Sequence, residues 1–218
     1  MMNIISALEQ SCDVFIYQIA LKTGIRRIKD MANRLGLGDV TGIGLPGEQQ
    51  GIIPTHEWKL ANQGRAWTPG ETVVSSIGQG YVLATPLQLA VMTARIANGK
   101  QAVTPRLVKS IGDAAPDFAP LDIDPFALAI IREGMFEVMN GGLGTARKYD
   151  LDKSLGGMAG KTGTVQVKRI TKAQREAGIV NNIDRPWAER DHALFVAYAP
   201  VKRPRYAISV VVEHGGSG

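Results

Sequence analysis

Gly156 to Val167 reads "GGMAGKTGTVQV", a combination that two unrelated chemistries use, one to bind phosphate and one to hold a substrate carboxylate. A phosphate-binding loop of the Gly-x-x-x-x-Gly-Lys-Thr type would need a glycine at position 155, a buried strand before the loop and a helix after it. Position 155 is a leucine, the preceding residues are "KYDLDKSLGG", and the residues from Thr164 to Val167 alternate as in a strand. The phosphate-binding interpretation is therefore disfavoured, and a strand beginning at the Lys-Thr-Gly-Thr sequence is predicted.

Lys161-Thr162-Gly163-Thr164 suits the recognition of a substrate carboxylate at the edge of an antiparallel strand. The ammonium group of Lys161 gives a positive field, and the hydroxyls of Thr162 and Thr164 can donate hydrogen bonds to a carboxylate. Gly163 lets a substrate backbone approach the strand, and an extended peptide can pair with its edge. The alternative for the tetrapeptide is an ordinary polar strand start that contains glycine.

Helices are predicted in the N-terminal part and again in the second half of the chain. Apolar residues from Ile4 to Leu21 follow a helical rhythm that "SCD" at Ser11 to Asp13 interrupts, which predicts helix, tight turn, helix, with Asp13 as N-cap of the second. Further helices are predicted over Ile25 to Leu35, from Thr85-Pro86 to Gly99 and from Asp124-Pro125 to Gly141.

The remaining segments are predicted to be loops and strands. Gly36 to Gly80 is rich in glycine and proline and is expected to form ordered loops without regular elements. "ALFVAYAP" and "YAISVVVE", joined by "VKRPR", predict a hairpin. Residues 170–191 are expected to be a polar insertion with a short helix around Lys172 to Ala177. The fold class is α/β, with an antiparallel sheet flanked by helices.

Composition sets broad limits. The chain has 218 residues, a net charge of +5, 44% hydrophobic and 21% charged residues, which fits a globular domain with a sizeable core. A nucleic-acid-binding module is the alternative that the charge suggests. The densest basic cluster has no aromatic residue among its members to stack on bases, so nucleic acid is not the expected partner; the cluster is Lys168, Arg169, Lys172 and Arg175. No apolar run approaches the ~20 residues that span a bilayer.

The quoted motifs resemble, in order and spacing, those of class B penicillin-binding proteins. The segments are "ALEQSCDVFIYQIA", "GIIPTHEWK", "PGETVVSSIGQGYVLATPLQLA", "GGMAGKTGTVQV" and "DHALFVAYAP", and the likeness covers almost the whole chain. The Asp of "SCD" and the insertion after "KTGTVQV" look most like the elongation-type branch, penicillin-binding protein 2. The resemblance implies the penicillin-binding protein/serine β-lactamase-like transpeptidase fold and a peptidoglycan D,D-transpeptidase that cross-links stem peptides by serine acyl transfer.

The resemblance also implies roles for individual residues. Ser11 would relay a proton, Asp13 would orient its neighbours or the substrate amide, and Lys161 would complete the catalytic group. Thr162, Gly163 and Thr164 would bind the substrate, and the backbone N–H of Thr164 would also form part of the oxyanion hole. The implied partners are stem peptides ending in D-Ala-D-Ala, β-lactams and proteins of the cell-elongation machinery, at the periplasmic face of the bacterial inner membrane. No cofactor is implied.

One motif of the family is absent from the sequence. Its nucleophile lies in Ser-x-x-Lys, and no serine of this chain is followed three positions later by a lysine. Residues 1–218 are therefore expected to be a partial transpeptidase domain, truncated at both ends, that lacks the nucleophile and is inactive alone. The alternative function is a non-catalytic domain that binds stem peptide or β-lactam as a sensor.

Several conspicuous residues are expected to be structural. Cys12 is interpreted as an ordinary thiol, with a zinc-ligand role as the alternative. Asp191 and His192 are expected to form hydrogen bonds at a strand end. "IGQGYVLATP" is expected to fix a loop under the site, where Gly78 and Gly80 permit unusual backbone angles. Packing roles are expected for the tryptophans, Trp58, Trp67 and Trp187.

Overall fold

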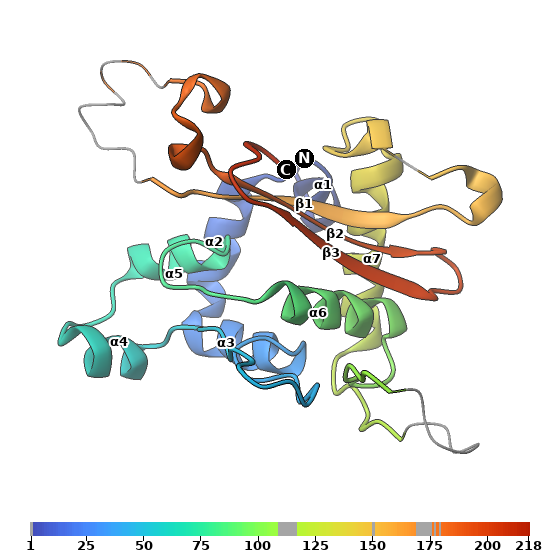
Figure 1. Ribbon diagram of the computed structural model, residues 1–218, viewed down its shortest axis with the longest axis horizontal. Helices are drawn as coiled ribbons and strands as arrows, with labels where there is room; N and C mark the ends of the chain where they lie inside the picture. Colours follow the sequence, from blue (N-terminus) through green and yellow to red (C-terminus); the bar gives the residue numbers. More distant parts are fainter. Residues whose placement is uncertain (1, 109–116, 150, 169–175, 177, 179) are drawn as a thin grey trace.

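A three-stranded antiparallel sheet in the order β1-β2-β3 lies at the centre of the structure (Figure 1). The strands are β1 (Ala159–Val165), β2 (His192–Ala199) and β3 (Tyr206–Val212). The computed structural model describes residues 2–108, 117–149, 151–168, 176, 178 and 180–218. β2 and β3 are consecutive and antiparallel, so the predicted hairpin is confirmed.

β1 begins two residues earlier than predicted. It includes Ala159 and Gly160 and ends at Val165, so the Lys-Thr-Gly-Thr sequence lies within the strand, and the strand predicted to continue to Val167 ends two residues earlier. Both early residues are buried. A Cβ atom at Gly160 would lie 2.8 Å from the Phe195 ring and 2.8 Å from the Val196 carbonyl oxygen. This close pairing with β2 extends the strand in the N-terminal direction, a tertiary effect that residue alternation does not report.

The part of the chain that the structure describes contains seven α-helices and four short 3₁₀ helices. The α-helices are α1 (Ile4–Glu9), α2 (Asp13–Thr23), α3 (Ile25–Arg34), α4 (His56–Gln63), α5 (Pro69–Ser76), α6 (Pro86–Asn98) and α7 (Pro125–Asn140). The 3₁₀ helices are η1 (Arg147–Tyr149), η2 (Lys153–Leu155), η3 (Asn182–Asp184) and η4 (Trp187–Glu189). The predicted helices at the N-terminus and those begun by Thr85-Pro86 and Asp124-Pro125 are confirmed.

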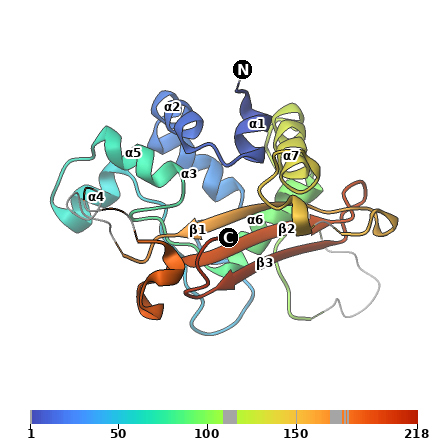
Figure 2. The ribbon, with the colours of Figure 1, turned by 90° about the horizontal axis from the view of Figure 1, so that it is seen from above.

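The main core forms where α6 and α7 pack against the sheet. Its buried members come from both helices, β1 and β2: Ile96, Ala97, Met135, Ala159 and Tyr198. Figure 2 shows β1 as the strand nearest to α1 and α7, and α1 packs in turn against α7. This packing holds the turn between α1 and α2 beside β1.

The second helix begins at Asp13, and this corrects the N-cap prediction. Cys12 is the N-cap residue and makes no side-chain capping hydrogen bond, while Asp13 is the acidic residue of the first turn. An aspartate there interacts favourably with the positive end of the helix dipole, and its carboxylate is not engaged as a cap. Asp13 is exposed.

The segment Gly36 to Gly80 contains two helices, so the expectation of loops alone was wrong. α4 begins after Thr55, whose Oγ1 accepts a hydrogen bond from the N–H of Trp58 (3.1 Å). α5 begins with a capping box in which the N–H of Thr68 donates to Glu71 Oε2 (2.7 Å). These start signals are present in the sequence, and the glycine and proline content of the segment obscured them.

Thr55→Ala tests the capping of α4. Thr55 is 7% exposed, and its loss leaves the Trp58 N–H without its side-chain acceptor. We expect the free energy of unfolding to fall by about 1 kcal/mol. Urea denaturation of Thr55→Ala and Thr55→Ser measures this, because serine keeps the acceptor. Equal stabilities of the two variants would contradict the capping role.

The polar insertion is described in part. The helix expected around Lys172 to Ala177 and three members of the basic cluster, Arg169, Lys172 and Arg175, lie outside the described residues. η3 and η4 follow them and lead into β2.

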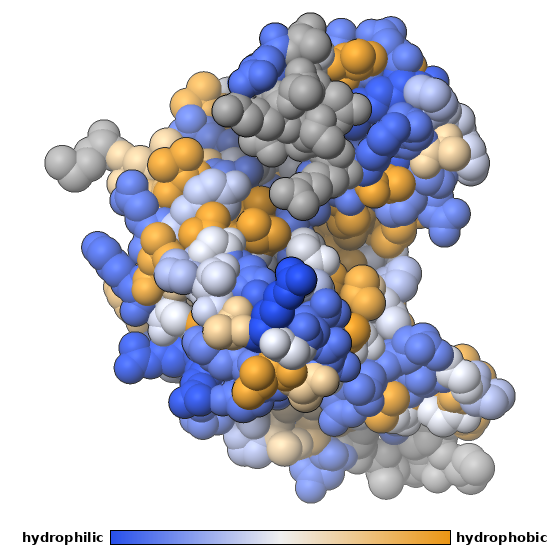
Figure 3. All heavy atoms as spheres, turned by 90° about the vertical axis from the view of Figure 1, so that its left-hand side faces the viewer, coloured by the Kyte–Doolittle hydropathy of each residue, from blue (hydrophilic) through white to orange (hydrophobic). Residues whose placement is uncertain are grey.

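Exposed apolar side chains occur on β3. Alternate residues on one face of this strand are all exposed: Tyr206, Ile208, Val210 and Val212. On the side of the molecule seen in Figure 3, hydrophobic residues are interspersed with hydrophilic ones. None of the helices in the described ranges is long and apolar enough to cross a membrane.

Candidate active site

The structure brings the two predicted motifs together. Lys161 lies on β1, and its Nζ donates a hydrogen bond to Ser11 Oγ in the turn between α1 and α2. The same Nζ donates to the carbonyl oxygen of Thr162 (2.9 Å). Ser11 and Lys161 are 150 residues apart in sequence, so their contact depends on the packing of α1 against α7 and of α7 against β1.

The turn that carries Ser11 is tight. The N–H of Cys12 donates to Ala7 O (2.8 Å), the N–H of Ser11 donates to Leu8 O (3.2 Å), and Ser11 has φ 52. A non-glycine residue in the left-handed region costs of order 1 kcal/mol, and such residues are concentrated at functional sites. This backbone conformation presents the Ser11 hydroxyl to Lys161.

Burial and a nearby negative charge shift the pKa of Lys161 in opposite directions. Removal from water lowers its pKa to about 8, and the negative charge of Asp13 partly opposes this. Asp13 lines the same cavity as Ser11 and Lys161. Near neutral pH the ammonium is therefore mostly charged and can lose its proton at small cost, which suits both carboxylate attraction and proton transfer.

The two threonine hydroxyls of the motif also lie at this cavity. Thr162 Oγ1 lies 3.1 Å from Thr145 Oγ1, and Thr164 Oγ1 accepts a hydrogen bond from the N–H of Gly218 (3.2 Å). Thr145 follows α7, where its N–H donates to Glu9 O (3.2 Å). Thr145 was not predicted as a site residue, because nothing local distinguishes it from other loop threonines.

Gln79 is a second residue of the cavity that was not predicted from the sequence. Its Nε2 donates to the carbonyl oxygen of Thr164 (2.8 Å), and its Oε1 accepts from the N–H of Gln166 (3.3 Å). The flanking Gly78 and Gly80 have φ 73 and φ 74, so the expectation of unusual backbone angles there is confirmed. The two glycines indicated a turn, but no local feature of the sequence indicated that Gln79 contacts β1.

These groups line one cavity of about 510 Å³. α1, the Ser11 turn and α2 form one wall, the end of α5 with Gln79 forms another, and β1 lies opposite with Lys161 to Thr164. Small and polar groups from β1 face hydroxyl, amide and carboxylate groups across the cavity. The arrangement can hold an anionic end of a ligand beside a strand edge.

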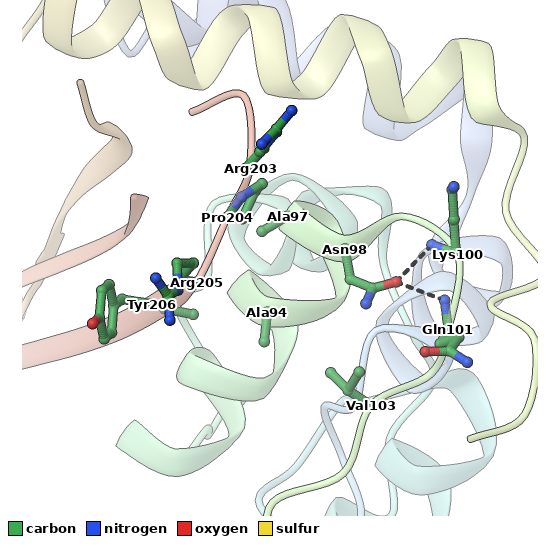
Figure 4. Close-up of a pocket in the computed structure, with 11 residues that line it drawn as sticks. Ala94, Ala97, Asn98, Lys100, Gln101, Val103, Arg203, Pro204, Arg205 and Tyr206 are labelled. Atoms are coloured by element: carbon green, nitrogen blue, oxygen red, sulfur yellow. Dashed lines mark hydrogen bonds between the residues drawn. The ribbon is translucent and has the colours of Figure 1, made fainter. Parts of the chain in front are cut away.

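A larger cavity of about 730 Å³ lies elsewhere, between the end of α6 and the β2–β3 connection. Lys100, Arg203 and Arg205 line it, and Figure 4 shows the Asn98 side chain bonded to the backbone of Lys100 and Gln101. None of the predicted site residues lines this cavity. Its size alone therefore does not make it the candidate site.

Asp191 and His192 act at a strand end, as expected. Asp191 Oδ1 accepts from the N–H of Val167 (3.2 Å) and Oδ2 accepts from Asn182 Nδ2 (2.7 Å). His192 Nδ1 accepts from the N–H of His214 (2.9 Å). These bonds join the insertion and the C-terminal segment to β1 and β2, and neither side chain lines the candidate site.

The other expected structural residues show ring contacts. Trp58 contacts Tyr81, Trp67 contacts His56 and Trp187 contacts His214, with ring centroids 5.2, 5.8 and 4.3 Å apart.

Cys12 is a free thiol. In the described part of the chain, no group of three or more His, Cys, Asp or Glu residues is placed to hold a metal ion.

The fold and this pair of motifs define a class of proteins, the penicillin-recognising transpeptidases. The model of the penicillin binding protein transpeptidase domain matches residues 1–218, so the chain belongs to this family. The resemblance to the penicillin-binding protein 2 branch is confirmed by relatives. Peptidoglycan D,D-transpeptidase MrdA of Acinetobacter baumannii is 36% identical over 99% of this chain, and that of Escherichia coli K12 is 34% identical over 100%.

Solved structures support the same assignment. Penicillin-binding protein 2 of Pseudomonas aeruginosa, in complex with WCK 5153, has a TM-score of 0.82 and 38% identity over 100% of this chain and 44% of that one. The same protein of Helicobacter pylori, in complex with MreC, has a TM-score of 0.83 and 34% identity over 98% of this chain and 37% of that one. The transpeptidase fold predicted from the sequence is confirmed. The chain spans about a third of the length of the curated relatives it matches, 32% and 35% for the two MrdA proteins.

Proposed function

We propose that this chain is part of a peptidoglycan D,D-transpeptidase that cross-links stem peptides during cell-wall elongation and is a target of β-lactams. The observation that carries the proposal is the contact between Lys161 Nζ and Ser11 Oγ in the same cavity as the hydroxyls of Thr162 and Thr164. In the reaction, a serine attacks the peptide bond between two D-alanines and releases the terminal D-alanine. The acyl group then passes to an amine of a neighbouring strand.

Residues of β1 bind the substrate. Thr162 and Thr164 hold the terminal carboxylate through their hydroxyls, and the charge of Lys161 attracts it. Gly163 has no side chain, so the substrate backbone can approach the strand.

Proton movement involves the opposite wall. Ser11, which accepts a hydrogen bond from Lys161, relays the proton between the nucleophile and the leaving amine, and Asp13 orients its neighbours. The Thr164 N–H stabilises the oxyanion of the tetrahedral intermediate. No step requires a metal or an organic cofactor.

The nucleophile belongs to a segment outside these residues. None of the serines in the sequence has a lysine three positions on, and the relatives are about three times as long as this chain. Residues 1–218 therefore form part of the transpeptidase domain, and the segment with Ser-x-x-Lys completes it. The complete protein acts at the periplasmic face of the inner membrane together with proteins of the elongation machinery, in keeping with the MreC complex of the Helicobacter pylori relative.

Intact-mass analysis after exposure to excess benzylpenicillin tests this function. The protein expressed from the complete reading frame should gain one stoichiometric adduct on the serine of a Ser-x-x-Lys sequence upstream of residue 1, and the 218-residue chain should gain none. An adduct on any serine of this chain would contradict the proposal. Reversible binding without an adduct in the complete protein would favour the sensor function.

Thr164→Val separates carboxylate recognition from folding. The substitution removes the hydroxyl and keeps the backbone N–H, and residue 164 is exposed. Loss of one hydrogen bond to a charged group should lower the rate of transpeptidation about 10- to 100-fold. The melting temperature should change little, and Thr164→Ser should retain most activity. Equal activity of the valine and serine variants would exclude a role for the hydroxyl.

A further inference from the structure

The side chain of Gln79 hydrogen-bonds to the free edge of β1, opposite the edge that pairs with β2. Its Nε2 lies 2.8 Å from the Thr164 carbonyl oxygen, and its Oε1 lies 3.3 Å from the Gln166 nitrogen. The carboxamide thus hydrogen-bonds to the backbone groups that precede and follow Val165, in the way that the backbone of a neighbouring strand would.

The backbone around Gln79 fixes the direction of this side chain. The N–H of Gly78 donates to Ser75 O (3.0 Å) and the N–H of Gln79 donates to Val74 O (3.1 Å), so both are tied to the end of α5. Gly78 and Gly80 both have φ in the left-handed region. Gln79 therefore lies in a turn of defined backbone conformation. This turn fixes the point from which its side chain reaches β1.

The alternation of β1 places the Thr164 N–H on the same edge. In a strand, the N–H and C=O of one residue point to the same side, and neighbouring residues point to opposite sides. Since Gln79 meets the Thr164 carbonyl, the Thr164 N–H also points toward the free edge, where Lys161, Thr162 and Gly163 line the cavity. The orientation of this N–H is thus coupled to the Gln79 carboxamide.

A second side chain holds the opposite edge just beyond the strand. Asp191 Oδ1 accepts a hydrogen bond from the N–H of Val167 (3.2 Å). β1 ends at Val165, so Gln79 and Asp191 hold the next two backbone N–H groups from opposite sides. Asp191 lies away from the cavity, whereas Gln79 lines it.

We infer that Gln79 is a positioning residue for acyl transfer: its carboxamide holds the backbone at Thr164 and Gln166 so that the Thr164 N–H is aimed at the oxyanion. The inference rests on the proposed function. Gln79 acts through the strand, and a donor that is already oriented needs no reorganisation as charge develops.

Acylation kinetics of the protein expressed from its complete reading frame test the inference. With a fluorescent penicillin, the noncovalent dissociation constant and the rate of the acylation step are measured separately for wild type, Gln79→Met and Gln63→Leu. Gln63 is an exposed residue of α4 outside the cavity, so Gln63→Leu should behave as wild type. We expect Gln79→Met to slow acylation about 10- to 100-fold, because a misaligned donor loses much of its effect on the transition state. Its dissociation constant should change less than about threefold, since ground-state binding uses the hydroxyls and Lys161.

A second variant covers the case in which Gln79→Met does not fold. Gln79→Asn keeps the amide but is one methylene shorter, so it cannot reach both backbone partners, and it should show the same loss of acylation rate. An acylation rate within twofold of wild type in the folded variants would overturn the inference, as would a loss confined to the dissociation constant. A wild-type protein that forms no adduct would instead overturn the proposed function, and the inference with it.

Discussion

Lys161→Met is expected to lower the acylation rate of the complete protein about 10³-fold, because both the charge that attracts the carboxylate and the proton donor to Ser11 are lost. Methionine is close to lysine in length and apolar, so the packing of β1 against β2 should persist. The hydrogen bonds from Nζ to Ser11 Oγ and to Thr162 O disappear.

The same substitution should stabilise the fold at neutral pH. The pKa of Lys161 is about 8 in the folded state, below the ordinary value of 10.5. Below pH 8 both the folded and the unfolded chain carry the charge, and its burial opposes folding in full. Between pH 8 and 10.5 only the unfolded state binds the proton, so wild-type stability rises with pH across this window.

Lys161→Met should therefore be more stable than wild type by about 1–2 kcal/mol at pH 6.5, after allowance for partial exposure and lost hydrogen bonds. The advantage should diminish by pH 9.5. Urea denaturation of the 218-residue chain at both pH values measures the difference. A stability difference between variant and wild type that grows with pH would contradict the lowered pKa of Lys161. A variant that acylates at the wild-type rate would contradict its role in the reaction.

Gln88→Leu should lower the free energy of unfolding by about 2–4 kcal/mol, because it leaves several backbone groups without partners. Gln88 is 0% exposed. Its Nε2 donates to Asp39 O (2.6 Å) and Gln50 O (2.9 Å), and its Oε1 accepts from the N–H of Thr85 (3.1 Å). The side chain of Gln88 thus accepts from the N-cap residue of its own helix. It also donates to two backbone carbonyl groups of the loop segment that precedes α6.

Leucine has nearly the volume of glutamine, so the expected loss comes from hydrogen bonding and not from a cavity. Gln18→Leu in α2 is the matched control, since Gln18 is exposed. Thermal and urea unfolding of the two variants should differ clearly. Equal stabilities would show that water replaces the amide at the Asp39 and Gln50 carbonyls.

Local signals in the sequence were sufficient for much of the fold. Threonine or aspartate before proline marked the starts of α6 and α7, and glycine marked their ends. These signals are reliable because helix termini need partners for their free N–H and C=O groups, and the residues that supply them lie within a few positions. The helices after Thr55 and Thr68 obey the same rule, and the glycine and proline content around them concealed it.

Ser11, Lys161, Thr162 and Thr164 could be predicted as candidate site residues from their motifs, and all four line one cavity in the structure. Thr145 and Gln79 could not, because their partners lie on β1, 17 and 85 residues away in sequence. A threonine or glutamine in a loop has no local feature that reveals such a contact.

The N-terminal helices, α6, α7 and the hairpin followed from the sequence, as did the residue types of the Ser11 and Lys161 motifs, because capping and alternation are properties of neighbouring residues. Three features arise only from tertiary packing: β1 begins at Ala159, burial lowers the pKa of Lys161 to about 8, and Gln79 hydrogen-bonds to the free edge of β1. Each of these depends on atoms brought from distant parts of the chain, since desolvation and strand-edge hydrogen bonds exist only once the elements have packed.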